Sequence, residues 1–227
     1  MASYPYPTLA KLLDLLYASQ SFVICLINGE QTSYTISSAS ISTANDTFAV
    51  ANHNFVDSTR VRVSAAAAST LPISTPQINP DTVYYVVQSA PGLFKLSLTK
   101  GGSAIDITSA GSGSVVVTEE PLGQQDSEVA NWIRHEISDY KGTARQTYSP
   151  GSAYFDEDIL KAATTPKMVT FLPTTGDLLV RYVLVIRGGS TTAKSTTGTI
   201  EEYEDFGYAA TFSKNVPKVY SLQQTLS

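Results

Sequence analysis

The chain has 227 residues, of which 42% are hydrophobic and 15% are charged, and its formal net charge is −5. This length and apolar content are enough for a sizeable core and permit one large domain or two small ones. The acidic balance offers no cationic field for phosphate backbones, which argues against nucleic acid as a partner. The single cysteine, Cys25, excludes an intramolecular disulfide framework, and its apolar neighbours predict a buried thiol.

No stretch approaches the roughly 20 apolar residues that a membrane-spanning helix needs. Residues Met1–Pro7 lack the positive charge of a secretory signal, and the apolar run Leu9–Leu16 is interrupted by Lys11 and Asp14. We therefore expect a soluble protein without a membrane partner that remains where it is made.

The first residues, Met1–Pro7, predict an extended arm because they hold two prolines and two tyrosines. Thr8 can cap a helix over residues 9–18 with an apolar stripe at Leu9, Leu12, Leu13 and Leu16. A helix this short is marginal alone. It must therefore pack on the rest of the chain or on another chain.

The segment Leu178–Arg187 predicts the central strand of a sheet, because it is rich in β-branched residues and almost continuously apolar. Strand-like segments flank it at Met168–Leu172 and Gly198–Tyr203, and the simplest topology is a meander with 178–187 in the middle. Ser21–Ile27 predicts another strand of the same sheet, ended by the Asn28-Gly29 turn.

Short strands separated by turn residues fill the region from about Ile41 to Thr118, which predicts a small antiparallel β-module. The expected strands are 47–50, 60–64, 82–88, 93–98, 104–108 and 115–118, with 65–80 as a loop. The fold class is therefore mainly β, with one or two short helices. We expect a discontinuous β-rich body of residues 1–37 plus 120–227, interrupted by an inserted module of residues 38–119.

Helical spacing returns at 126–137, which predicts a short helix that carries the only tryptophan, Trp132, with Asp126 or Ser127 as its cap. Residues 156–163 fit either a short helix with an acidic start or a turn. The tail, residues 212–227, can supply one more strand or an arm.

The module resembles a small β-module that recurs in structural proteins of tailed bacteriophages. The resemblance lies in 81–87, in 93–99, in 101–108 and in Gly111-Ser112-Gly113. The body resembles a class of phage virion proteins through 22–27, 141–146, 181–186 and 204–207. These residues belong to strands and turns, so the resemblance implies a fold and a context and supplies no catalytic positions.

Candidate catalytic residues are sparse. His53 and His135 are the only histidines: His53 sits in a polar turn, where a surface residue is the default, and His135 lacks a second histidine four residues on. Two acidic clusters could gather calcium or serve a glycosidase, Asp156-Glu157-Asp158 and the four acids among residues 201–205. Helix capping and solvated strand positions are the simpler accounts, so we expect no catalytic residue, no cofactor and no bound metal.

The resemblance implies a non-enzymatic structural protein of a tailed phage virion, assembled in the bacterial host cytoplasm. The leading expectation is a capsid-decorating, or cement, protein that bridges capsid subunits; the alternatives are a tail, baseplate or fibre-associated protein, and a glycan-degrading tail enzyme. Expected partners are other copies of the chain, as a trimer, and the major capsid protein, or else tail and baseplate proteins. The interface candidates lie in the arm, the first helix and the tail: Tyr4, Tyr6, Leu9, Leu12, Leu13, Leu16, Val216, Val219, Tyr220 and Leu222.

Overall fold

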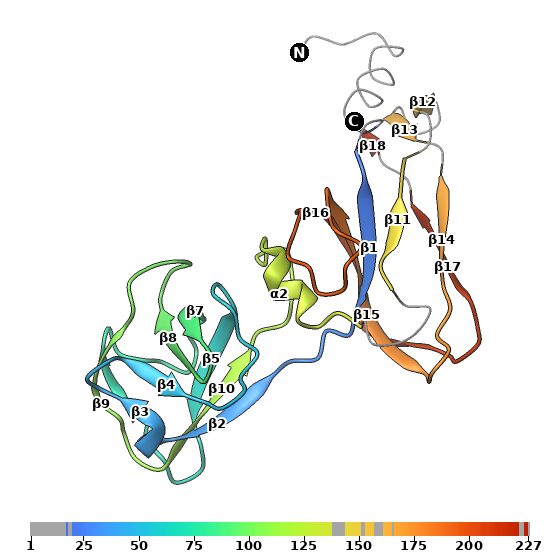
Figure 1. Cartoon of the computed structure of the whole chain (residues 1–227). Coiled ribbons are helices and arrows are strands. Elements are labelled where there is room, and N and C mark those ends of the chain that lie inside the picture. Colours follow the sequence, from blue (N-terminus) through green and yellow to red (C-terminus); the bar gives the residue numbers. More distant parts are fainter. Residues whose placement is uncertain are drawn as a thin grey trace, which may run out of the picture. The chain divides into compact units, whose positions relative to one another are not determined.

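The computed structural model describes residues 17, 20–137, 144–150, 153–156, 161–164, 166–222 and 225–226 (Figure 1). The described chain is mainly β, as predicted, and its sheets are antiparallel. The predicted arm and first helix lie outside the described residues, apart from Tyr17. No helix in the described part of the chain is both long enough and apolar enough to cross a bilayer.

The chain forms two compact units. One comprises residues 1–29 and 135–227, which we call the body unit, and the other comprises residues 30–134, which we call the module unit. The boundaries expected from the sequence were 37/38 and 119/120. The structure instead assigns the strand Ser33–Ser37 and the Trp132 helix to the module unit.

The body unit contains a four-stranded sheet in the order β11-β1-β15-β16. Its strands are β1 (Phe22–Ile27), β11 (Gln146–Tyr148), β15 (Leu178–Arg187) and β16 (Thr199–Phe212). A two-stranded sheet pairs β14 (Lys167–Phe171) with β17 (Lys218–Leu222), and the two strands run side by side in Figure 1. A third sheet is formed by β12 (Ala153–Asp156), β13 (Lys161–Thr164) and β18 (Thr225–Leu226).

The central position of β15 is confirmed, and so is its pairing with β16. Its other neighbour is β1, which was predicted to belong to the same sheet. The predicted meander is wrong in one respect, because β14 pairs with β17 of the tail and not with β15. The helix considered for 156–163 is also wrong: β12 ends at Asp156 and β13 begins at Lys161. The tail supplies strands, one of the two alternatives.

Both faces are buried along β1 and along β15 from Tyr182 to Ile186, which explains their continuous apolar sequence. Phe22, Ile24 and Leu26 belong to one core cluster with Val183 and Val185 of β15. The opposite face is equally buried and consists of Val23, Cys25, Ile27, Tyr182, Leu184 and Ile186. Cys25 is fully buried, as predicted.

A large bulge divides β16. Val180 pairs with Ala210 and Tyr182 pairs with Asp205, so residues 206–209 of β16 lie opposite Arg181 alone. Gly207 takes a positive φ of 74° in this bulge, a conformation that glycine adopts without steric cost. A second register shift falls between Val185 and Ile186. Such bulges bend a strand and redirect its side chains.

The module unit is built on a seven-stranded sheet in the order β2-β10-β5-β7-β8-β4-β3. The strands are β2 (Ser33–Ser37), β3 (Ile41–Ser42), β4 (Thr47–Ala49), β5 (Arg60–Ala65), β7 (Tyr84–Ala90), β8 (Leu93–Ser97) and β10 (Ser114–Glu119). A smaller sheet pairs β6 (Ile73–Thr75) with β9 (Asp106–Ser109), and β6 lies within the predicted loop. One core cluster, which includes Phe48, Tyr84 and Phe94, fills the unit.

The tryptophan helix is α2 (Val129–Ile133), and a 3₁₀ turn spans Ser38–Ser40. The predicted cap of α2 is wrong: its N-cap is Glu128, which makes no side-chain capping bond. The Asp126 carboxylate instead accepts hydrogen bonds from Arg60 and from the Gly123 N–H. Trp132 is fully buried and donates its indole N–H to the carbonyl of Asp126, 2.7 Å away.

Candidate functional site

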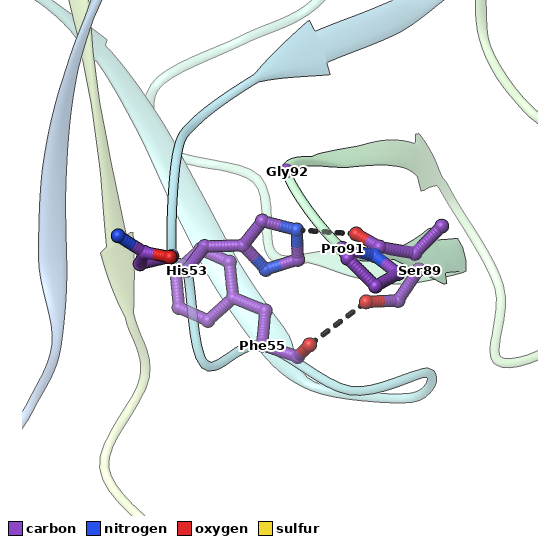
Figure 2. Close-up of a pocket in the computed structure, with 7 residues that line it drawn as sticks. His53, Phe55, Ser89, Pro91 and Gly92 are labelled. Carbon is purple, nitrogen blue, oxygen red and sulfur yellow. Dashed lines mark hydrogen bonds between the residues drawn. The ribbon is translucent and has the colours of Figure 1, made fainter.

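A shallow pocket lies in the module unit where the β4–β5 loop meets the β7–β8 turn. Its volume is about 380 Å³, and Figure 2 shows the His53 ring reaching across it toward Pro91. The Ser89 hydroxyl joins the two segments by donating to the Phe55 carbonyl, 2.8 Å away. The other lining residues are Asn52, Ala90 and Gly92.

His53 fastens the two loops together. Its Nε2 lies 2.9 Å from the Ala90 carbonyl oxygen and 3.0 Å from that of Leu93. Because carbonyl oxygens only accept, Nε2 carries the proton and donates to both. The ring also packs against Phe94, with 5.2 Å between centroids. His53 lies at the surface, as expected, but it is half-buried and its ring takes part in the loop packing.

The other nitrogen of His53, Nδ1, is buried and makes no hydrogen bond with any described residue. A general base must present its lone pair to a substrate, and this one is turned away from solvent. His135 is also buried and lies two residues beyond the end of α2, and its carbonyl accepts from the Asn28 N–H, 3.0 Å away. The two histidines belong to different units.

The acidic run of β16 divides into paired and unpaired carboxylates. Glu201 accepts from the Tyr17 hydroxyl at 2.9 Å and lies 3.4 Å from Arg187 Nε. Asp205 accepts two bonds from Arg181, at 3.2 and 3.3 Å, and a third from the Gly207 N–H. The hydrogen bond from Arg181 lowers the pKa of Asp205 against the opposing effect of burial.

Glu202 and Glu204 have no cationic partner among the described residues. They pair across the sheet with Val185 and Val183, so both point to the side on which the body core lies. Partial burial, and then the like charges of Glu201 and Glu204, raise the pKa of Glu202. The sequence marked the acidic run but gave no means of separating its paired members from its unpaired ones.

A groove runs beside these carboxylates, between β16 and β17. It consists of two hollows of about 370 and 300 Å³ that share Glu204 and Tyr220 as lining residues. Val183 and Val185 line the first hollow, and Phe206 and Val219 line the second. We call this the β16 groove; its lining combines apolar side chains with the carboxylates of β16.

The Tyr220 hydroxyl is buried in the wall of the β16 groove. Burial, and then the nearby Glu204 carboxylate, raise the pKa of this phenol. The two side chains do not meet in the geometry of a normal hydrogen bond, so the hydroxyl has no such partner among the described residues. The ring itself packs on the body core and against Phe206, with 6.1 Å between centroids.

A buried ion pair holds the loop between β15 and β16, residues 188–198. Arg145 donates Nε to Glu136 Oε1 at 2.9 Å and Nη2 to Oε2 at 3.0 Å, and the two side chains are 0% and 1% exposed. Arg145 also donates to the carbonyls of Ser190 and Ser195, while Glu136 accepts the Lys194 N–H. We call this arrangement the Arg145 clasp.

The Arg145 clasp lies beside the buried Cys25 thiol. Burial, and then the Glu136 carboxylate, raise the pKa of Cys25 to about 12. Although burial alone lowers the pKa of Arg145, its bonds to Glu136 raise it overall. The Arg145 guanidinium of the clasp therefore stays charged, and the thiol beside it is neutral and shielded.

The sheet formed by β14 and β17 turns an apolar face to solvent. Register places Met168, Thr170 and Val219 on one face, opposite the buried Val169 and Phe171. Met168 is 71% exposed and Val219 is 57% exposed, and Leu172, which follows β14, is 38% exposed. We call Met168, Leu172 and Val219 the β14–β17 face.

The predicted interface residues fall into three groups. Val219 and Val216 are exposed, whereas Tyr220 faces the body core. Leu222 is the last residue of β17, and its side chain is not among those that the structure describes. The arm and helix candidates, Tyr4, Tyr6, Leu9, Leu12, Leu13 and Leu16, lie outside the described residues.

Within the described ranges, no three His, Cys, Asp or Glu side chains gather closely enough to hold a metal ion. Asp156 ends β12, and Glu157 and Asp158 are outside the described residues. No protein-family model, no curated protein and no solved structure matches this chain. The geometry above is therefore the basis for the functional argument, together with the resemblance described from the sequence.

Proposed function

We propose that this protein is a non-enzymatic structural protein of a tailed bacteriophage virion, and that it decorates the capsid by bridging neighbouring capsid subunits. The resemblance of the module segments 81–87, 93–99, 101–108 and 111–113, and of the body segments named above, to phage structural proteins supports this context. The two-unit β organisation is compatible with one unit that attaches and another that projects. The observation that carries the proposal is the exposed β14–β17 face.

An exposed apolar face of this kind suits adhesion. Single exposed apolar residues are ordinary, but several on one face of a small sheet mark a contact surface. Burying such a face against a partner stabilises the complex by about 25 cal/mol for each Å² of apolar surface removed from water. The partners in this proposal are other copies of the chain, arranged as a trimer, and the major capsid protein.

The proposal is tested by placing charged side chains on the β14–β17 face. Met168→Asp combined with Val219→Asp should abolish binding to capsids that lack the protein, because both charges would lose their hydration in the contact. Ile73→Asp is the matched control: Ile73 is 58% exposed but lies on β6 of the module unit. Normal capsid binding by the folded double variant would contradict the proposal.

The proposed function also predicts a role for the N-terminal arm and first helix. A protein that lacks residues 1–18 should keep a folded body and lose attachment to the particle. Its incorporation into virions at the normal level would show that the arm makes no contact. Binding of the full chain to tails instead of capsids would support the alternative of a tail or baseplate protein.

A further inference from the structure

Strand β16 forms an edge of its sheet in the described part of the chain. This strand has 14 residues and is the last strand of its sheet, and no described strand pairs with its outer edge. An edge strand presents backbone N–H and C=O groups on which another extended chain can add. Its edge is therefore a surface where backbone hydrogen bonds are available to a partner.

The charges on this strand select the partner. Glu202 and Glu204 are two residues apart on the same face and lack a cation among the described residues, whereas Glu201 and Asp205 are each held by an arginine. Burial, and then the like charges of Glu201 and Glu204, raise the pKa of Glu202, and a cation placed beside it would offset those like charges. A strand added to the edge places its alternate side chains opposite this pair.

The β16 groove provides room for such side chains. It opens beside Glu202 and Glu204, and Val183, Val185 and Tyr220 supply apolar walls. Long basic side chains suit this shape, because their methylene stems pack on apolar surface while their charged ends reach carboxylates. The groove and the edge of β16 therefore favour the same kind of ligand.

We propose that the edge of β16 over residues 200–206 binds an extended segment of another polypeptide, with Lys or Arg at alternate positions facing Glu202 and Glu204. The segment adds as a further strand. A second copy of the chain is a poorer match among the described strands. The edge strands β11, β14 and β17 carry at most one basic residue each, at a strand end in β14 and β17. The inference does not depend on the virion context.

The opposing account is that the carboxylates only prevent unwanted strand pairing, as charges on edges often do. A peptide experiment separates the two accounts. The probe is a labelled ten-residue peptide of alternating Lys and Val, and its control has the same composition with the lysines adjacent. A third peptide carries N-methyl groups on alternate residues, which removes the backbone donors along one edge. Binding is followed by fluorescence anisotropy against the whole protein.

The alternating peptide should bind about tenfold more tightly than the peptide with adjacent lysines, and N-methylation should abolish binding. Glu202→Gln with Glu204→Gln should weaken binding about tenfold, while Asp106→Asn, an exposed carboxylate on β9 of the module unit, should not change it. Three results would overturn the proposal. The first is equal binding of all three peptides, and the second is no binding of the alternating peptide at about 1 mM. The third is self-association of the protein that Glu202→Gln abolishes.

Discussion

Removal of the Arg145 side chain tests the energetics of the body unit most sharply. Arg145→Met deletes both bonds to Glu136 and the bonds to the Ser190 and Ser195 carbonyls. Glu136 would then remain buried at 1% exposure, with the Lys194 N–H as its one remaining donor among the described residues. Breaking one side of a buried ion pair typically costs about 3–5 kcal/mol, a large share of the stability of an ordinary domain.

The measurement is urea unfolding with hydrogen exchange of the β1 and β15 amides, because Trp132 fluorescence reports the module unit. The Lys194 amide should exchange much faster in the variant. Arg181→Met is the matched control: its pair with Asp205 is about one-third exposed, so a loss below about 1 kcal/mol is expected. If Arg145→Met also costs less than about 1 kcal/mol, with Lys194 still protected, the clasp does not hold the loop.

Three further predictions concern other parts of the chain. Because burial raises the Cys25 pKa to about 12, its thiol should resist alkylation at pH 8 in the folded protein. The pKa of Cys25 is higher in the folded than in the unfolded protein, so the protonated thiol contributes fully to stability below about pH 8.5, and this contribution is lost toward pH 12. A free energy of unfolding that stays flat with pH in Cys25→Ala, where wild type declines, would support this account. Residues 30–134 expressed alone should unfold cooperatively by Trp132 fluorescence, whereas 38–119 should not fold, since it lacks β2 and α2. His53→Ala should destabilise the module unit by about 2 kcal/mol in the same assay, because it removes a packed ring and its bonds to two carbonyls; a change under about 0.5 kcal/mol would contradict the loop-fastening role.

The sequence predicted the strands whose residues decide their own conformation. β1 and β15 are runs of β-branched and large apolar residues, and only a strand buried on both faces accommodates such runs. Which strand pairs with which depends on residues that lie far apart in the sequence. The rule that consecutive strands lie close in space predicted a pairing of β14 with β15, but its partner β17 comes from the tail, 51 residues from Lys167 to Lys218 along the chain.

Polar strands were missed for a different reason. β2 and β6 are rich in serine and threonine and have few apolar positions, so their conformation comes from pairing with β10 and β9. Residues 156–163 carry acidic residues at their start, a pattern that also begins helices, and the pairing of β12 with β13 overrides it.

The candidate site was predictable in composition but not in geometry. The acidic run of β16 is evident in the sequence, whereas its division into paired and unpaired carboxylates depends on the bulges of β16. Arg145 and Glu136 are nine residues apart in unremarkable surroundings, and only the fold brings both beside the 188–198 loop. Tyr220 was expected at an interface, but the register with Val169 turns it toward the core.

The most direct test of the proposed function mixes the purified protein with capsids that lack it, and separately with tails, and follows binding by sedimentation and electron microscopy. The account predicts regular decoration of the whole shell, lost in the Met168→Asp and Val219→Asp double variant and retained in Ile73→Asp. Binding to tails alone, or to neither particle, would contradict a capsid-decorating role.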